Sequence, residues 1–192
     1  MGETHDDLRQ RLRKARASLD DASQQRAGDA LLSKVLALPE YSRSQHIAAY
    51  SAVMGEISLE PLIDRALADG KSIYLPILRE VDLRFAPYTR ESAMRINRFR
   101  LPEPDVPDEI MLAPRELDLV LAPLVVFDAN CNRIGMGGGY YDRSFEFRRT
   151  TDIDRPTLIG VAHELQRVDA LQPEPWDVRL DAVASDQHIY RP

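Results

Sequence analysis

The chain has 192 residues, of which 44% are hydrophobic and 29% charged, and its formal net charge is -6 at pH 7. This length and composition are typical of a single globular domain, and the negative charge disfavours a general nucleic-acid binder, which needs a clustered basic surface. One cysteine, Cys131, excludes an internal disulfide and a cysteine-rich zinc site, and the lack of both a run of about 20 apolar residues and an apolar N-terminal segment predicts a cytoplasmic protein without membrane contacts.

Helical periodicity comes first along the chain. Leucine and alanine recur at spacings of three and four, and arginines repeat at the same spacing on a separate stripe. Pro39 should end the second helical stretch, Ser58 suits the N-cap of the third, and Gly70 supplies its stop. The predicted helices cover residues 6–19, 22–38 and 58–67, with a short one near 141–147.

Strand signals are short apolar runs between these helices. The strongest is LDLVLAPLVVF at residues 117–127, which is almost continuously apolar, as expected of a strand covered on both faces. Residues 100–114 are rich in proline and are predicted to form an irregular surface excursion. Other strands are expected at residues 46–51, 72–75, 83–88, 157–162 and 181–185.

Alternation of strands and helices defines the fold class. Such alternation favours a layered α/β domain. We therefore expect one three-layer α/β domain over residues 1–192, with a mostly parallel or mixed central sheet flanked by helices.

A glycine-rich segment, RIGMGGGYYD, covers residues 133–142, with four glycines in the five positions 135–139. Glycine lets the backbone approach a phosphate and direct successive N–H groups at it. Arg133 suits a bidentate phosphate contact, and Asp142 suits a metal ion on the phosphates. The segment is neither a Walker A loop nor a dinucleotide fingerprint. The alternative is a tight turn with positive φ angles, but three consecutive glycines exceed that need, so we predict phosphate binding.

Around this segment the sequence resembles the 5-formyltetrahydrofolate cyclo-ligase (5,10-methenyltetrahydrofolate synthetase) family. The resemblance spans nearly the whole chain, and the order and spacing of its motifs carry it. These motifs are LRQRLRKAR at residues 8–16, GEI at 55–57, LPEP at 101–104, DLVLAPLVVFD at 118–128, RIGMGGGYYDR at 133–143 and PWDVRLDAV at 175–183.

The resemblance implies an enzyme that uses ATP and Mg²⁺ to close 5-formyltetrahydrofolate into 5,10-methenyltetrahydrofolate, with release of ADP and phosphate. In the family, the formyl oxygen takes the γ-phosphoryl group to give an iminium phosphate, and N10 then displaces phosphate. Such a reaction depends mainly on positioning and charge neutralisation and needs no protein nucleophile. We expect a monomer whose partners are these two small molecules.

The resemblance also assigns residues to the nucleotide and the metal. Asp142 and Asp177 match the two family carboxylates at Mg²⁺, and Arg133 and Tyr140 are the predicted catalytic residues. One departure is His5, which stands where the family often has lysine; we exclude it from the site, and Arg11 or Arg13 is the candidate substitute. The predicted ATP-binding residues are Arg9, Arg13, Arg133, Ile134, Gly135, Met136, Gly137, Gly138, Gly139, Tyr140 and Tyr141.

A second set is predicted to bind the folate. Glu56 matches a family glutamate that accepts hydrogen bonds from the pterin ring, and Phe99 lies near an aromatic position able to stack on it. Part of the glycine-rich segment is shared, because the phosphoryl group passes directly between the two substrates. The predicted folate-binding residues are Ser51, Glu56, Phe99, Met136, Gly137, Gly138, Gly139 and Tyr140.

Without the resemblance, plainer interpretations stay open for most of these residues. Asp142 is then an acid in a first helical turn, Asp177 and Glu56 are turn residues, and the stripe of Arg9, Arg13 and Arg16 is a solvated helix face. Cys131 has no evident activating partner, and His163 reads as a structural histidine.

Three other functions also stay open. A sugar-phosphate isomerase or acyl transferase on a similar scaffold needs no ATP. A regulatory folate or nucleotide binder releases no ADP. RNA binding through the arginine stripe is strongly weakened by salt.

Overall fold

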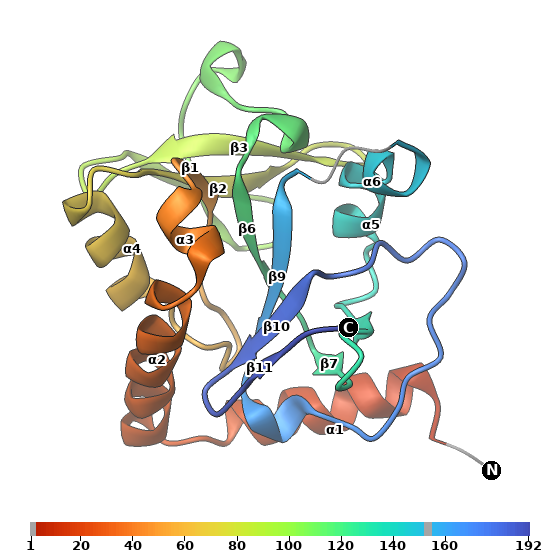
Figure 1. The fold of residues 1–192 in the computed structure, drawn as a ribbon. Coiled ribbons are helices and arrows are strands. Elements are labelled where there is room, and N and C mark those ends of the chain that lie inside the picture. Colours follow the sequence, from red (N-terminus) through yellow and green to blue (C-terminus); the bar gives the residue numbers. More distant parts are fainter. Residues whose placement is uncertain (1–2, 152–154) are drawn as a thin grey trace.

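The computed structural model describes residues 3–151 and 155–192, and a seven-stranded sheet runs through its centre (Figure 1). Its strands are β1 (His46–Ala48), β2 (Ser72–Leu78), β3 (Leu83–Tyr88), β6 (Leu119–Pro123), β9 (Thr157–Ala162), β10 (Ala182–Ser185) and β11 (Ile189–Tyr190). They lie in the order β11-β10-β9-β6-β1-β2-β3. All neighbours from β10 to β2 are parallel, and β11 and β3 pair antiparallel at the edges. The predicted mixed sheet is confirmed.

The central strands are mainly apolar because both faces of the sheet are covered. In β6, Leu119 and Leu121 join the core on one face, whereas Val120 and Ala122 join the core on the other. The alternation of side chains along a strand thus divides one apolar run between two cores.

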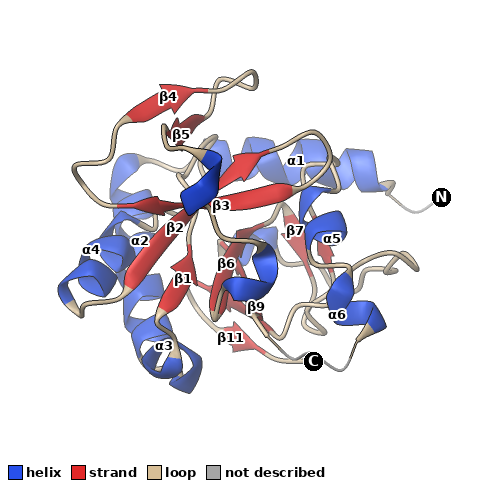
Figure 2. Cartoon of the chain, turned by 90° about the horizontal axis from the view of Figure 1, so that it is seen from above, coloured by secondary structure: helices blue, strands red, loops and turns tan. Residues whose placement is uncertain are grey.

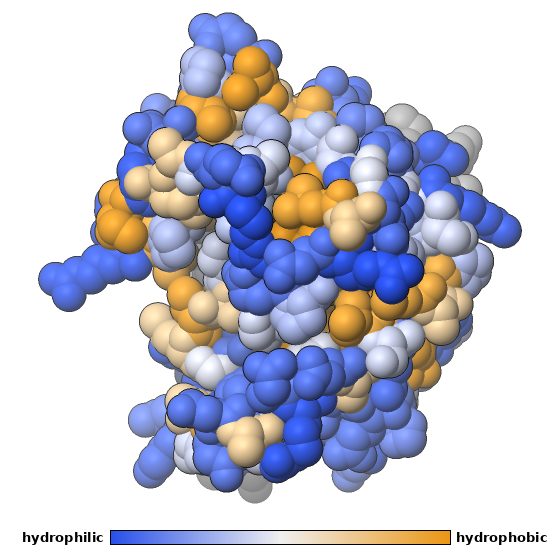
Figure 3. All heavy atoms as spheres, turned by 90° about the vertical axis from the view of Figure 1, so that its left-hand side faces the viewer, coloured by the Kyte–Doolittle hydropathy of each residue, from blue (hydrophilic) through white to orange (hydrophobic). Residues whose placement is uncertain are grey.

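Helices cover both faces of the sheet (Figure 1). On one side lie α2 (Asp21–Leu36), α3 (Pro39–Arg43) and α4 (Glu60–Ala68), and on the other lie the short helices α5 (Tyr140–Ser144) and α6 (Phe147–Thr150). This arrangement confirms the predicted three-layer α/β architecture. The outer surface on the side of α2 and α4 is largely hydrophilic, with small separate apolar patches (Figure 3). Among the described residues, no helix combines the length and apolar character needed to cross a membrane.

The N-terminal helix α1 (His5–Ala17) lies at one end of the sheet rather than on a face (Figure 1). Thr4 and Asp7 form a capping box that satisfies N–H groups of its first turn. Leu8 and Leu12 pack against Val126 and Ile134, which belong to β7 (Val126–Phe127) and β8 (Arg133–Ile134). This contact places α1 beside the strand that leads into the glycine-rich segment.

The apolar run at residues 117–127 was predicted as one strand, and the structure divides it into β6 and β7. Between them the chain leaves the sheet, and the carbonyls of Leu124 and Val125 accept hydrogen bonds from side chains instead of a neighbouring strand. Strand β7 pairs antiparallel with β8, in the register Val126↔Ile134. A short hairpin, and not the long strand, therefore leads into the glycine-rich segment.

The bounds of α1, α2 and α4 differ from the predictions by one or two residues, and two further differences concern a cap and the number of helices. The helix expected at residues 58–67 has Leu59 at its N-cap, and the Ser58 hydroxyl accepts a longer bond of 3.3 Å from the Glu60 N–H. The single short helix expected near 141–147 is two helices, α5 and α6, separated by Phe145 and Glu146. The Phe145 ring is fully buried, which fixes both helices against the sheet.

The excursion predicted as irregular over residues 100–114 contains regular structure. Strand β5 (Pro102–Pro104) pairs antiparallel with β4 (Met94–Ile96), and Figure 2 shows them as a small separate sheet beside the main one. Two 3-10 turns, η1 (Asp108–Ile110) and η2 (Pro114–Glu116), follow. Arg95 joins the two strands by donating to the buried Glu103, with 2.9 Å between Nε and Oε1. This small sheet carries Phe99 towards the site.

Candidate active site

A cavity of about 680 Å³ collects nearly all of the predicted site residues. Leu75, Leu78, Leu83 and Pro123 form an apolar part of its wall. Arg13 is the one predicted residue that does not line it. The predicted residues that do are Arg9, Ser51, Glu56, Phe99, Arg133, Ile134, Gly135, Met136, Gly137, Gly138, Gly139, Tyr140, Tyr141, Asp142 and Asp177.

The glycine-rich segment is an open loop along this cavity. Gly137 and Gly139 have φ angles of 94° and 65°, which side-chain-bearing residues rarely adopt. Two arginines fix its carbonyls: Arg9 Nε donates to the Gly135 oxygen at 2.9 Å, and Arg143 Nη2 donates to the Gly138 oxygen at 2.8 Å. Within the described part of the chain, the N–H groups at positions 136–139 donate to no protein acceptor. They are therefore available to a ligand with several acceptor oxygens.

Arg133 is held differently from the open phosphate fork that we predicted. Its side chain is 8% exposed, and Nη2 donates to Asp142 Oδ1 at 2.6 Å while Nη1 donates to the Val178 oxygen. Asp142 Oδ1 also accepts the Val178 N–H at 3.1 Å. The Arg133–Asp142 pair thus joins the glycine-rich loop to the segment that carries Asp177.

The two predicted metal ligands line the same cavity from these two segments. Asp142 uses Oδ1 for Arg133 and Val178, and Asp177 uses Oδ2 for the Glu174 N–H at 2.8 Å. Within the described residues, the second oxygen of each carboxylate has no hydrogen-bond donor. Residues 3–151 and 155–192 contain no cluster of three His, Cys, Asp or Glu side chains suited to a metal. Two carboxylates fit Mg²⁺ because this ion usually takes one or two protein carboxylates together with substrate phosphates and water.

Arg9, Arg13 and Arg16 of α1 contact other parts of the protein, whereas Arg11 is exposed and pairs with Glu3. Arg9 contacts the glycine-rich loop, and Arg13 Nη2 lies 3.1 Å from the Met54 sulfur. Arg16 is fully buried and donates to Glu56, Met54 and Leu124. The solvated-face interpretation is therefore wrong for Arg16, which the helical pattern alone did not separate from its neighbours.

Glu56 lines the same cavity as the glycine-rich loop, with its side chain 9% exposed. Oε1 accepts from Arg16 Nη2 and Oε2 accepts from the Val53 N–H, each at 3.1 Å. Burial raises the pKa of Glu56, and the charge of Arg16 opposes that rise. A carboxylate offers about four lone-pair sites, so this one retains capacity for a ligand that donates hydrogen bonds.

Aromatic side chains occupy other parts of the wall. Phe99 is half exposed, with the Arg98 guanidinium 4.9 Å from the centre of its ring. The Tyr140 hydroxyl accepts from Arg98 Nη2 at 3.4 Å. Tyr141 stacks on Phe145, and burial raises the pKa of its hydroxyl. Phe99 and Tyr140 are placed where they can contact a planar ligand.

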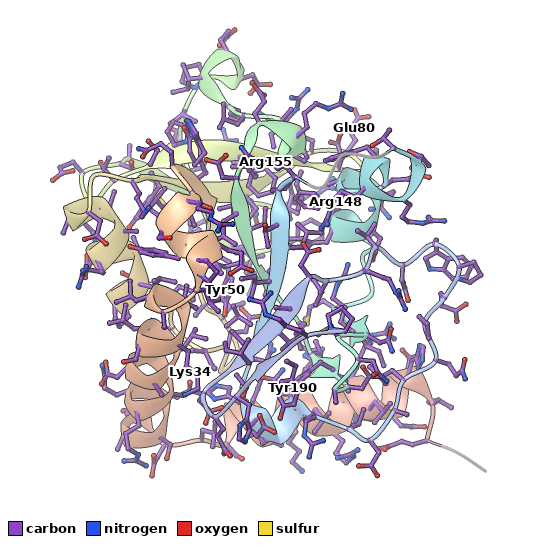
Figure 4. The ribbon with its side chains drawn as sticks, viewed as in Figure 1. Lys34, Tyr50, Glu80, Arg148, Arg155 and Tyr190 are labelled. Carbon is purple, nitrogen blue, oxygen red and sulfur yellow. The ribbon has the colours of Figure 1, made fainter. Side chains whose placement is uncertain are left out.

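Several residues on the cavity wall were not predicted. Tyr50, Val53 and Met54 precede the GEI motif, and Trp176 lies within the PWD motif, so their proximity to those motifs was a usable signal. Tyr50 lies in the interior of the fold, and its hydroxyl donates to the Ile57 oxygen (Figure 4). His5, which we excluded from the site, also lines the cavity.

Two residues that were interpreted as structural are buried. His163 is 2% exposed, and its Nε2 lies 3.0 Å from the Gly55 oxygen. Burial lowers the pKa of His163. Cys131 is buried as well, and burial raises its pKa to about 11. A thiol with such a pKa is a poor nucleophile at neutral pH.

Comparison with known proteins identifies the family of the chain. A model of the 5-formyltetrahydrofolate cyclo-ligase family matches residues 1–186. The 5-formyltetrahydrofolate cyclo-ligase of Haemophilus influenzae is 35% identical over 176 residues, which cover 90% of this chain and 92% of that protein. The enzyme of the same name from Escherichia coli K12 is 31% identical over 182 residues, covering 93% and 98%.

A solved structure gives the same result for the fold. The NMR structure of the Aquifex aeolicus 5,10-methenyltetrahydrofolate synthetase superposes with a TM-score of 0.83 and 25% identity, covering 97% of this chain and 92% of that one. The family model, the relatives and the fold agree along almost the whole chain. The protein belongs to the 5-formyltetrahydrofolate cyclo-ligase family and is therefore a ligase.

Proposed function

We propose that this protein converts 5-formyltetrahydrofolate to 5,10-methenyltetrahydrofolate at the expense of ATP, with Mg²⁺ as cofactor. The observation that carries the proposal is the convergence, on one cavity, of a glycine loop with free N–H groups, two carboxylates and a buried glutamate. The loop suits a triphosphate, and Glu56 suits the N–H edge of a pterin. Both substrates then meet along the segment Met136, Gly137, Gly138, Gly139 and Tyr140.

The proposed reaction has two steps. The formyl oxygen attacks the γ-phosphorus, an O–P bond forms, the bond between the γ-phosphorus and the bridging oxygen breaks, and ADP leaves. N10 then attacks the activated carbon, the C–O bond breaks with release of phosphate, and N10 gives its proton to solvent. The first step converts a poor leaving group into a good one, which is why ATP is needed.

The residues of the chain bind and orient the two substrates in this scheme. The N–H groups at positions 136–139 receive phosphate oxygens, and Arg9 adds positive charge beside them. Glu56 accepts hydrogen bonds from the pterin, and Phe99 stacks on its ring. The apolar wall at Leu75, Leu78 and Leu83 limits access of water to the activated formyl group.

Asp142 and Asp177 are the proposed ligands of Mg²⁺, each through the carboxylate oxygen that carries no protein donor. When bound, the ion neutralises charge on the transferring phosphoryl group. Arg133 holds Asp142 in place through the bond between Nη2 and Oδ1. Its predicted catalytic role, like that of Tyr140, stays a prediction, as do the single domain, the monomeric state, the absence of nucleic-acid binding and the cytoplasmic location.

The test is a coupled assay on the purified protein. With Mg-ATP and 5-formyltetrahydrofolate, the near-ultraviolet absorbance of the methenyl product should rise in step with ADP release. Addition of EDTA should stop both signals, and excess Mg²⁺ should restore them. A folded sample that binds the folate without releasing ADP would instead be a non-catalytic binder, and the proposal would be abandoned.

A further inference from the structure

Arg16 is a fully buried charged residue that contacts Glu56 on the cavity wall but does not line the cavity itself. Its side chain is 1% exposed, and its three nitrogens each have a protein acceptor. Nε donates to the Met54 oxygen at 3.1 Å, Nη1 to the Leu124 oxygen at 3.0 Å, and Nη2 to Glu56 Oε1 at 3.1 Å. Arg16 therefore links α1, the turn before Glu56 and the break between β6 and β7.

The backbone of this turn also has supports other than the Arg16 side chain. Gly55 has a φ of +76°, and a Cβ atom there would come within 2.6 Å of the Arg16 carbonyl oxygen. The Gly55 oxygen lies 3.0 Å from His163 Nε2 and accepts from Gln24 Nε2 at 3.1 Å. The backbone thus has several supports, whereas the Glu56 carboxylate has only Arg16 and the Val53 N–H within the described residues.

A buried ion pair is an inefficient way to stabilise a fold, because the desolvation of both charges offsets much of their attraction. The pair here has one property that an apolar pair lacks: it presents a negatively charged, oriented carboxylate to the cavity. On the proposed function, that carboxylate is the group that meets the pterin.

We propose that Arg16 is a positioning residue for the folate, acting through Glu56 without touching the substrate. It holds Oε1 in place and leaves the remaining lone pairs of the carboxylate directed to the cavity. This inference rests on the proposed function and extends it to a residue outside the cavity wall.

The test is a double-substitution cycle read by binding. Calorimetry measures the affinity of 5-formyltetrahydrofolate, without ATP, for the wild-type protein and for Arg16→Met, Glu56→Gln and the double variant. Glu56→Gln and Arg16→Met should each weaken binding about tenfold or more, the usual effect of losing a bond to a charged group. In the double variant, Arg16→Met should add less than about threefold, because two residues that act as one unit are not additive.

If the losses of folate affinity in the two single variants multiply in the double variant, the proposal is overturned and Arg16 has only a structural role. If the wild-type protein does not bind 5-formyltetrahydrofolate, the proposal is overturned as well. If it binds the folate tightly without turnover, only the proposed reaction is removed. Because Arg16→Met leaves a buried carboxylate unpaired, circular dichroism checks that each variant folds. If Arg16→Met does not fold, Arg16→Lys replaces it under the same criteria, since lysine keeps the charge but loses the three-way geometry.

The pH dependence gives a second readout. Folate binding needs ionised Glu56, so affinity should fall as the pH is lowered through a pKa that burial has raised above the usual glutamate value. Arg16 and Arg13 lower this pKa, and the neutral hydroxyls of Tyr50 and Tyr141 lie nearby. In Arg16→Met the loss of folate affinity at low pH should begin at a higher pH. In Glu56→Gln and in the double variant this loss should be absent. An unchanged pH profile of folate affinity in Arg16→Met would contradict the proposal. Arg16 also influences the pKa of His163. The effect of Arg16→Met in the Glu56→Gln protein measures this contribution, because Glu56 cannot titrate there.

Discussion

Gly55 occupies a position that no other residue fits, because two separate restrictions meet there. Its φ of +76° is unfavourable for a side chain, and α1 passes so close that an added Cβ would lie 2.6–2.9 Å from backbone atoms of Arg16 and Ala17. Gly70 shares the first restriction, with a φ of +75°, but nothing lies within 4 Å of its missing Cβ. A comparison of the two glycines therefore distinguishes the cost of the left-handed conformation, which both share, from the cost of the steric clash, which only Gly55 has.

Gly55→Ala should destabilise the protein more than Gly70→Ala. The left-handed conformation alone costs about 1 kcal/mol, and the clash at Gly55 should add about 1–3 kcal/mol because backbone must move. Urea denaturation of both variants measures the difference in the free energy of unfolding. Equal losses would mean that α1 moves aside at little cost.

Asp177 is the simpler of the two proposed metal ligands to test. Asp142 also holds Arg133, so a change there has structural effects, whereas Asp177 Oδ2 accepts only the Glu174 N–H within the described residues. An asparagine amide oxygen can keep that bond.

Asp177→Asn should raise the Mg²⁺ concentration needed for half-maximal turnover by at least about tenfold, because losing a ligand should cost no less than losing one of its supports. Activity assays over a Mg²⁺ series measure this, with Asp169→Asn, an exposed residue outside the cavity wall, as the matched control. A normal Mg²⁺ requirement in Asp177→Asn would remove Asp177 from the metal site.

At the scale of elements, α1 connects the two halves of the proposed site. Its first half supports the glycine-rich loop through Arg9, and two turns later Arg16 supports Glu56. The leucines of the same helix pack on β7 and β8, so the helix position and the loop position are set together. We expect changes at its two ends to affect different substrates.

Arg9→Met should raise the KM for ATP about tenfold or more, because it removes a positive charge and the bond to the Gly135 oxygen. The KM for 5-formyltetrahydrofolate should stay nearly constant. Steady-state kinetics with each substrate varied in turn measures both, and Lys14→Met, on the exposed side of the same helix, is the control. A parallel rise in both KM values would show that α1 acts as one undivided support.

At the scale of the whole molecule, the cavity is built from segments far apart in the sequence. The loop from β8 to α5, the turn at Glu56, the loop of the small β4–β5 sheet and the segment at Trp176 each contribute part of the wall. Trp176 is the one tryptophan of the chain, is 61% exposed, and precedes Asp177. Its fluorescence should therefore report on the side of the cavity where we propose that the nucleotide binds.

Binding of Mg-ADP should protect Trp176 from quenching by iodide, because the nucleotide occupies the space beside the glycine-rich loop. Stern–Volmer titration with and without saturating Mg-ADP measures the change, and Trp176→Phe should abolish the signal. Unchanged quenching, with nucleotide binding established by calorimetry, would place the nucleotide elsewhere.

Local patterns in the sequence were sufficient for the class of the fold, and most of the predicted site residues line one cavity, although their roles stay predictions. The apolar run at residues 117–127 and the helical periodicity predicted a layered α/β sheet, and the glycine-rich segment pointed to a phosphate-binding loop. Such signals are readable because strand burial, helix periodicity and the need for glycine act over a few residues. The motif order added the remaining site positions through resemblance to one family.

Only the tertiary structure decided what the charged side chains contact. Arg9, Arg13 and Arg16 look alike along the helix, but one contacts the loop, one contacts Met54 and one is fully buried with Glu56. Likewise, Arg133 reads as an open phosphate fork, and the fold pairs it with Asp142 and the carbonyl of Val178. The physical reason is that burial and ion pairing depend on segments many residues away, which no local pattern records.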